Sequence, residues 1–176
     1  FDKIENRVFY NNWHPHNYTD YYSSLFDHNH ENVKKVFECG IGTNNPDLPS
    51  SMGSNYTPGG SLKVWRDYFP NAYIYGADID KEILFQSERI KTYYVDQLDK
   101  DSIKKMWSEI KVDNFDLIID DGLHTLEAGI SLFENSFSYL KKGGIYIIED
   151  VDPNYIYGLS NYLNKKKNIE IIRLKS

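Results

Sequence analysis

The chain has 176 residues, of which 40% are hydrophobic and 26% charged, the composition of a globular domain rather than of a disordered segment. Its formal net charge of −6 argues against a general nucleic-acid binder, because such proteins present a basic surface to phosphates. No apolar run approaches the length needed to span a membrane, so no membrane partner is expected. A single cysteine, Cys39, excludes an internal disulfide framework and favours a reducing compartment. We therefore expect a cytoplasmic protein of one domain, residues 1–176.

In chain order, the part up to about His30 is rich in tyrosine, histidine and asparagine and contains one predicted helix, around Thr19–Asp27. Six apolar runs of strand length follow, and segments of helical period lie between them. The runs are Val36–Ile41, Ala72–Ile79, Ile90–Val95, Phe115–Ile119, Gly144–Ile148 and Ile169–Leu174. Strands that alternate with helices predict a doubly wound, Rossmann-like α/β fold with a mostly parallel sheet.

Two helices are predicted from their apolar period. Ile103, Met106, Trp107 and Ile110 share one helical face, and a second helix runs from Leu126 to Leu140. Lys141–Gly144 then offers basic residues and glycines, a pattern typical of a helix end.

The segment Thr43–Gly60 is far longer than an ordinary strand-to-helix loop and is rich in Asn, Pro, Ser and Gly. Loops of this length are usually either functional or disordered. Because it follows a glycine-rich turn at the end of a strand, we expect it to act as a lid over a ligand.

Carboxylates follow every one of the first five predicted strands, at the edge where open α/β sheets bind ligands. Gly40 and Gly42 allow a tight turn after the first strand, and Asp78 ends the next strand at a position suited to the two hydroxyls of a ribose. Asn45 replaces the third glycine of a dinucleotide fingerprint, and Glu38 would repel a pyrophosphate. The pattern favours a ligand with a cationic head, such as S-adenosylmethionine.

Longer strings carry a family resemblance. Glu38–Gly42 resembles the first motif of class I S-adenosylmethionine-dependent methyltransferases. The other strings are similar to the macrocin and mycinamicin type of sugar O-methyltransferase, which is related to the cephalosporin-hydroxylase-like proteins. They are Pro58–Leu62, Trp65–Pro70, Tyr75–Asp80, Ile118–His124 and Lys142–Asp150. The resemblance covers about Tyr18 to Leu174.

The resemblance implies a role for each strand end. The cofactor-binding residues would be Glu38, Gly40 and Gly42 at the methionine part, Asp78 at the ribose, Asp96 and Gln97 beside the adenine, and Asp120 at the fourth strand end. Asp121, Glu149 and Asp150 would be metal ligands, and His124 the catalytic base. Three carboxylates are hard oxygen ligands, which suit Mg²⁺, Mn²⁺ or Ca²⁺ rather than zinc, and Mg²⁺ is expected.

The same resemblance implies that residues 1–30 cover the cofactor and that the substrate is a sugar or a nucleotide-linked sugar. Class I methyltransferases close their sheet with a seventh strand, and none follows Ile169–Leu174, so we expect this strand to be missing. A homo-oligomer is compatible with the exposed edge. Two alternatives stay open at this point: a metal-free methyltransferase of another small metabolite, and a non-catalytic domain that binds S-adenosylmethionine.

Overall fold

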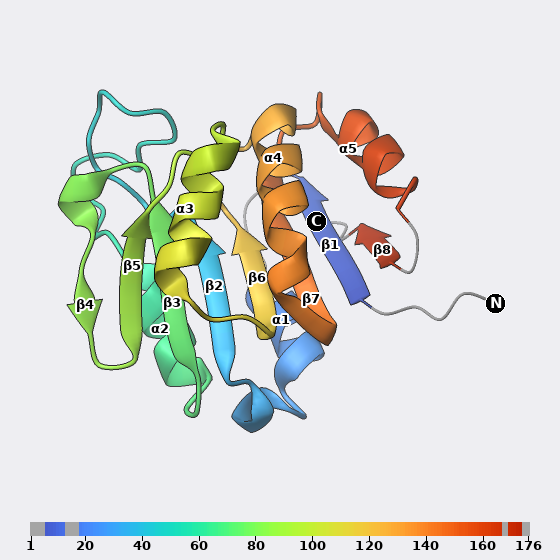
Figure 1. Cartoon of the computed structure of the whole chain (residues 1–176), viewed down its shortest axis with the longest axis horizontal. Helices are drawn as coiled ribbons and strands as arrows, with labels where there is room; N and C mark the ends of the chain where they lie inside the picture. Colours follow the sequence, from blue (N-terminus) through green and yellow to red (C-terminus); the bar gives the residue numbers. More distant parts are fainter. Residues whose placement is uncertain (1–5, 13–17, 167–168, 174–176) are drawn as a thin grey trace.

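The computed structural model describes residues 6–12, 18–166 and 169–173. One eight-stranded sheet runs through these residues in the order β4-β5-β3-β2-β6-β7-β1-β8 (Figure 1). Every neighbouring pair is parallel except β4 and β5, which are antiparallel. The predicted doubly wound, mostly parallel α/β fold is confirmed.

The strands are β1 (Asn6–Asn12), β2 (Lys35–Cys39), β3 (Tyr73–Asp78), β4 (Gln86–Ser87), β5 (Ile90–Tyr94), β6 (Phe115–Asp120), β7 (Leu140–Val151) and β8 (Ile169–Arg173). The helices are α1 (Tyr18–Phe26), α2 (Gly60–Tyr68), α3 (Lys100–Ile110), α4 (Leu126–Ser136) and α5 (Ile156–Leu163). Three short 3₁₀ turns lie at His30–Asn32, Lys81–Ile83 and Phe137–Tyr139.

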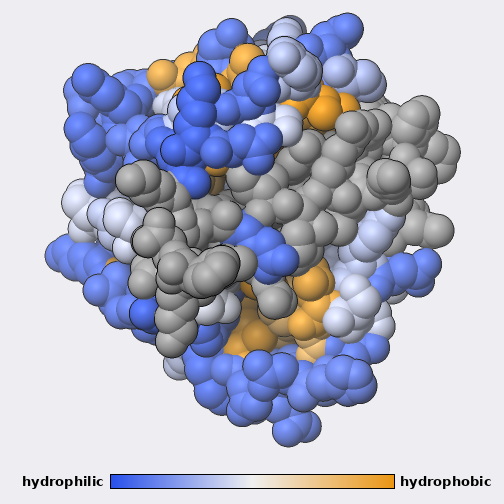
Figure 2. Space-filling model, turned by 90° about the vertical axis from the view of Figure 1, so that its right-hand side faces the viewer, coloured by the Kyte–Doolittle hydropathy of each residue, from blue (hydrophilic) through white to orange (hydrophobic). Residues whose placement is uncertain are grey.

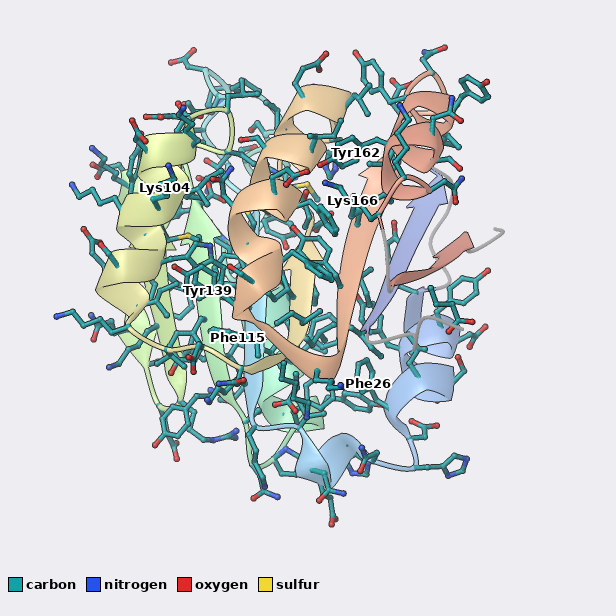
Figure 3. All side chains as sticks on the ribbon, turned by 45° about the vertical axis from the view of Figure 1, so that its right-hand side comes forward. Phe26, Lys104, Phe115, Tyr139, Tyr162 and Lys166 are labelled. Carbon is teal, nitrogen blue, oxygen red and sulfur yellow. The ribbon has the colours of Figure 1, made fainter. Side chains whose placement is uncertain are left out.

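Helices cover both faces of the sheet, and each face has its own apolar core (Figure 1). On the face of α3, α4 and α5, the buried ring of Trp107 lies 5.4 Å from that of Phe115 and stacks on that of Tyr139 at 4.3 Å. Phe26 of α1 lies in the core of the opposite face. Figure 3 labels Phe26, Phe115 and Tyr139. The central strands are buried on both sides, which explains their continuous apolar runs.

The sequence predicted no strand before residue 30, and this expectation was wrong. Residues 6–12 form β1, which lies in the sheet between β7 and β8 and pairs in parallel with both. Only Val8, Phe9 and Tyr10 make an apolar run in this segment, so its sequence gives little strand signal. Pairing with two other strands, which are distant in the sequence, holds it in place. The helix expected around Thr19–Asp27 is present as α1.

The predicted end of the fourth helix also differs. Helix α4 ends at Ser136, and β7 already begins at Leu140, so Lys141–Gly144 belongs to a strand rather than to a helix cap. The buried carboxylate of Asp116 on β6 pairs with the Lys141 ammonium, and Leu140 itself pairs with Phe115 across the sheet. These cross-strand partners, which the local pattern does not reveal, decide the boundary.

Within the residues that the structure describes, none of the helices is both long and apolar enough to cross a bilayer. Figure 2 shows the face at the β8 end of the sheet, where hydrophobic side chains reach the surface among hydrophilic ones.

Candidate functional site

A cavity of about 510 Å³ lies beyond the carboxyl ends of β2, β3, β5, β6 and β7. This is the edge at which open α/β sheets bind ligands. Most of the residues singled out from the sequence line it: Gly40, Gly42, Asp78, Asp96, Gln97, Asp121, His124, Glu149 and Asp150. Glu38 and Asp120 do not line the cavity; both are almost fully buried beside it.

The turn after β2 needs glycine at both predicted positions. Gly40 and Gly42 have φ angles of +87° and +80°, in the left-handed region that side chains rarely adopt. A Cβ atom at Gly40 would collide with the backbone carbonyl of Asp121, and one at Gly42 would collide with the ring of Tyr56. The turn therefore packs closely against both the β6 loop and the Thr43–Gly60 segment.

Asp78 connects this turn with the end of β3. One of its carboxylate oxygens accepts a hydrogen bond from the Ile41 amide at 2.9 Å, and the other accepts one from the Asp80 amide at 2.9 Å. Burial raises the pKa of the Asp78 carboxyl above its ordinary value. Its side chain lines the cavity while it also fixes the backbone of the glycine turn.

Glu38 faces α2. Its two oxygens accept hydrogen bonds from the hydroxyl of Ser61 and from the indole N–H of Trp65. The side chain is 2% exposed, and this burial raises the pKa of the Glu38 carboxyl to about 7. The family resemblance implied that Glu38 lies at the methionine part of a cofactor; in the structure its carboxyl group is buried just behind the cavity wall.

Asp121, His124 and Asp150 converge at one point of the cavity, with ligand atoms that all lie within 4.8 Å of one another. They come from the loop after β6 and from the end of β7. His124 and Asp150 have φ angles of +59° and +47°, a conformation that non-glycine residues keep only where the surrounding structure holds them and that is concentrated at functional sites.

Burial is the main reason that the pKa of His124 lies below its ordinary value, so the imidazole is neutral at neutral pH. The backbone carbonyl of Glu149 accepts a hydrogen bond from its ring. In a neutral histidine only one ring nitrogen carries a proton. Because that nitrogen donates to the carbonyl, the other nitrogen is an acceptor. That arrangement is suited to a general base.

The residues fit a divalent cation. Burial raises the pKa of the Asp121 carboxyl strongly, and the charges of Glu149, Glu38 and Asp150 raise it further. Carboxylates that destabilise one another in this way form an oxygen donor set suited to a small hard cation, and the imidazole of His124 lies beside them. Of the three predicted ligands, Asp121 and Asp150 belong to the converging group, and Glu149 adjoins it.

Two tyrosines of α1 contact this acidic group, and the sequence did not single them out as site residues. The Tyr18 hydroxyl donates a hydrogen bond to Asp150, and the Tyr22 hydroxyl donates one to Glu149. Their spacing of four residues, which places both on one face of α1, was the only local sign. Burial raises the pKa of Glu149 to about 8.

The Thr43–Gly60 segment contributes Pro49, Ser50, Met52 and Tyr56 to the cavity wall. Its backbone is hydrogen-bonded to the glycine turn, because the Met52 amide donates to the Thr43 carbonyl and the Gly59 amide to the Ile41 carbonyl, both at 2.8 Å. The segment therefore lies where a lid over the cavity would have to lie. Its closure over a ligand stays a prediction.

Several known proteins are similar to this chain. It is 32% identical over 143 residues to 8-demethyl-8-alpha-L-rhamnosyl tetracenomycin-C 2'-O-methyltransferase of Streptomyces olivaceus, a match that spans 81% of this chain and 35% of the relative. It is 32% identical over 142 residues to mycinamicin VI 2''-O-methyltransferase of Micromonospora griseorubida, which spans 80% and 33%. The chain thus spans about a third of the length of these curated relatives. No family model matches the sequence.

Among solved structures, the chain is similar to the MycE methyltransferase of the mycinamycin pathway in complex with Mg and SAH. That match has a TM-score of 0.64 at 30% identity and covers 82% of this chain and 37% of the other. A second structure of MycE, which also contains mycinamycin VI, matches with a TM-score of 0.65 at 28% identity and covers 85% and 42%.

The arrangement of the sheet is similar to that of the MycE methyltransferase over the part that the two chains share, and the cavity lies at the carboxyl ends of its parallel strands. Over the part that they share, the chain is a relative of the sugar O-methyltransferases of the macrocin and mycinamicin type. The resemblance that the sequence motifs carried is confirmed.

Proposed function

We propose that this chain carries the catalytic domain of an S-adenosylmethionine-dependent O-methyltransferase that acts on a hydroxyl of a sugar or a sugar-containing small molecule with the help of a divalent cation, Mg²⁺ above all. One observation carries the proposal: a single cavity joins the glycine turn after β2 to the converging side chains of Asp121, His124 and Asp150. The relatives named above, which are sugar O-methyltransferases, support it.

At the cofactor end, Gly40 and Gly42 line the cavity, and the methionine part of the cofactor would lie against their turn. Asp78 would accept from the ribose hydroxyls, and Asp96 would lie at the adenine end. Glu38, Asp120 and Asp78 place three carboxyl groups around this part of the cavity, which a ligand with an ammonium and a sulfonium group would hold in their charged form.

At the reacting end, Asp121, Glu149 and Asp150 would hold the cation. When bound, the cation would supply positive charge that orients two neighbouring sugar hydroxyls and favours ionisation of the attacking one. His124, neutral and with one nitrogen turned to the Glu149 carbonyl, takes the proton from the attacking hydroxyl. The oxygen forms a bond to the methyl carbon, and the electron pair of the broken carbon–sulfur bond stays on sulfur.

The experiment compares the wild type, His124→Ala and the control His28→Ala, which lies in an exposed turn before β2. Each is incubated with S-adenosylmethionine, Mg²⁺ and a panel of rhamnosyl and macrolide glycosides, and methylated product is measured by mass spectrometry. We expect His124→Ala to lose about 10²–10⁴-fold in rate, the range of general base catalysis, while its affinity for S-adenosylhomocysteine in calorimetry is retained. His28→Ala keeps the rate.

A wild type that does not bind S-adenosylhomocysteine contradicts the proposal. Binding that ignores Mg²⁺, with transfer to an acceptor that has no sugar, contradicts its cation and sugar parts. A nucleotide-linked sugar as acceptor, a homo-oligomer and a cytoplasmic location all stay predictions. The single, buried Cys39 supports a reducing compartment.

A further inference from the structure

The side chain of Gln97 connects two segments that form the site. Its amide nitrogen donates a hydrogen bond to a carboxylate oxygen of Asp120 at 2.6 Å. Its carbonyl oxygen accepts one from the backbone amide of Leu123 at 3.0 Å. Gln97 is only 7% exposed, and Asp120 is 3% exposed, so both contacts lie in the protein interior. Buried polar groups of this kind are well suited to fix a backbone.

The backbone that Gln97 contacts is the loop after β6. This loop carries Asp121 and His124 into the cavity, and it is held at its start by a hydrogen bond from the Asp121 amide to the Cys39 carbonyl at 2.8 Å. At its other end His124 has its left-handed φ of +59°. Leu123 lies directly before that residue. Its bond to Gln97 therefore restrains the loop where the strained conformation begins.

Gly122 shows how closely the amide approaches the loop. A Cβ atom at this position would collide with the carbonyl oxygen of Gln97. Gly122 has no positive φ, so glycine is required here because a side chain would not fit, and not because of an unusual backbone conformation. The loop and the amide of Gln97 are fitted to one another.

We infer that Gln97 is a positioning residue which, anchored on Asp120, holds the Asp121–His124 loop in the geometry that presents a cation ligand and the base to the cavity. The role of the loop rests on the proposed function. The contacts also assign a role to Asp120, which does not line the cavity: it accepts the hydrogen bond that anchors the Gln97 amide. The family resemblance implied that Gln97 lies beside the adenine; in the structure its carbonyl oxygen and its amide nitrogen make hydrogen bonds within the protein.

The test replaces Gln97 by Met, which keeps an unbranched side chain of similar length without an amide. The control is Gln86→Met on the exposed strand β4. Four quantities are measured on the whole chain: hydrogen exchange at the Leu123 amide, affinity for S-adenosylhomocysteine, affinity for Mg²⁺, and kcat and KM for methyl transfer. A melting curve checks that each variant folds.

For Gln97→Met we expect exchange at Leu123 to become about tenfold faster, as for the loss of one buried hydrogen bond. Mg²⁺ affinity should fall about tenfold and kcat about 10²-fold, because a ligand and the base lose their alignment. S-adenosylhomocysteine affinity and the KM for S-adenosylmethionine should stay as in the wild type. Gln86→Met should change none of these quantities.

Gly122→Ala disturbs the same contact from the loop side and should give the same signature. Combined with Gln97→Met it should add little, because both substitutions remove one interaction.

A Gln97→Met variant with weaker S-adenosylhomocysteine binding and normal exchange at Leu123 would overturn the inference, since that pattern identifies an adenine contact. Faster exchange at Leu123 and weaker Mg²⁺ binding support it even where no acceptor is methylated, and in that case the proposed function alone has failed.

Discussion

The buried carboxyl of Glu38 makes a defined contribution to the pH dependence of stability. Burial raises its pKa from the ordinary 4.5 to about 7. The folded state therefore binds this proton more tightly than the unfolded state does. The resulting stabilisation is complete below pH 4.5 and is lost as the pH rises through 7. At about 1.4 kcal/mol per pKa unit, the free energy of unfolding falls by about 3 kcal/mol through this one group.

Glu38→Gln removes the titration while it keeps the shape. The amide can still accept from Trp65 and can donate to the hydroxyl of Ser61, so the two contacts survive in neutral form. Glu38 also helps to raise the pKa of Glu149, so the substitution should flatten the curve further. From pH 5 to pH 8, we expect the free energy of unfolding of the variant to rise by about 2–3 kcal/mol relative to that of the wild type.

Urea unfolding at pH 5 and pH 8, with a chelator present, measures the free energy of unfolding of both proteins. It shows how far the gap between the variant and the wild type changes with pH. Glu31→Gln, at an exposed position, is the control and should follow the wild type at both pH values. Parallel stability curves for Glu38→Gln and the wild type would refute the reasoning, because the folded state would then hold Glu38 no differently from the unfolded chain.

Three further outcomes are expected. Gly40→Ala should lower the free energy of unfolding by more than about 3 kcal/mol or abolish S-adenosylhomocysteine binding, because its Cβ atom would collide with backbone atoms. Urea unfolding and calorimetry measure the two effects. The control Gly53→Ala has a similar φ but no atom within 4 Å of the added Cβ, so it should show the cost of the backbone strain alone. Tyr22→Phe should weaken Mg²⁺ binding about tenfold in calorimetry, because it removes the hydrogen bond to Glu149. The control Tyr68→Phe loses a tyrosine–carboxylate hydrogen bond at the surface and should leave Mg²⁺ binding unchanged. Equal effects of the two substitutions would argue against a role of α1 at the cation. Mg²⁺ affinity should rise between pH 6 and pH 8, because the raised pKa of Glu149, about 8, keeps this carboxyl protonated below that pH; a flat profile in calorimetry would exclude Glu149 as a ligand.

The sequence by itself determined the architecture and the edge of the sheet at which the cavity lies. Strands such as β2 and β6 are buried on both sides, so their apolar runs are continuous and easily recognised. The carboxyl ends of parallel strands meet at one edge, so residues that end different strands converge without any knowledge of tertiary contacts. Gly40 and Asp78 were placed correctly beside one cavity for this reason.

Only the tertiary structure decided which atoms meet at that edge. Tyr22 reaches Glu149 across 127 residues of sequence, and Gln97 reaches Leu123 across 26, and no local pattern encodes such pairs. Strand β1 was missed because its hydrogen-bond partners, not its own apolar content, make it a strand. A residue type and its place on a strand fix which edge it lies at, whereas its partners depend on how separate elements pack, and packing is a property of the whole fold.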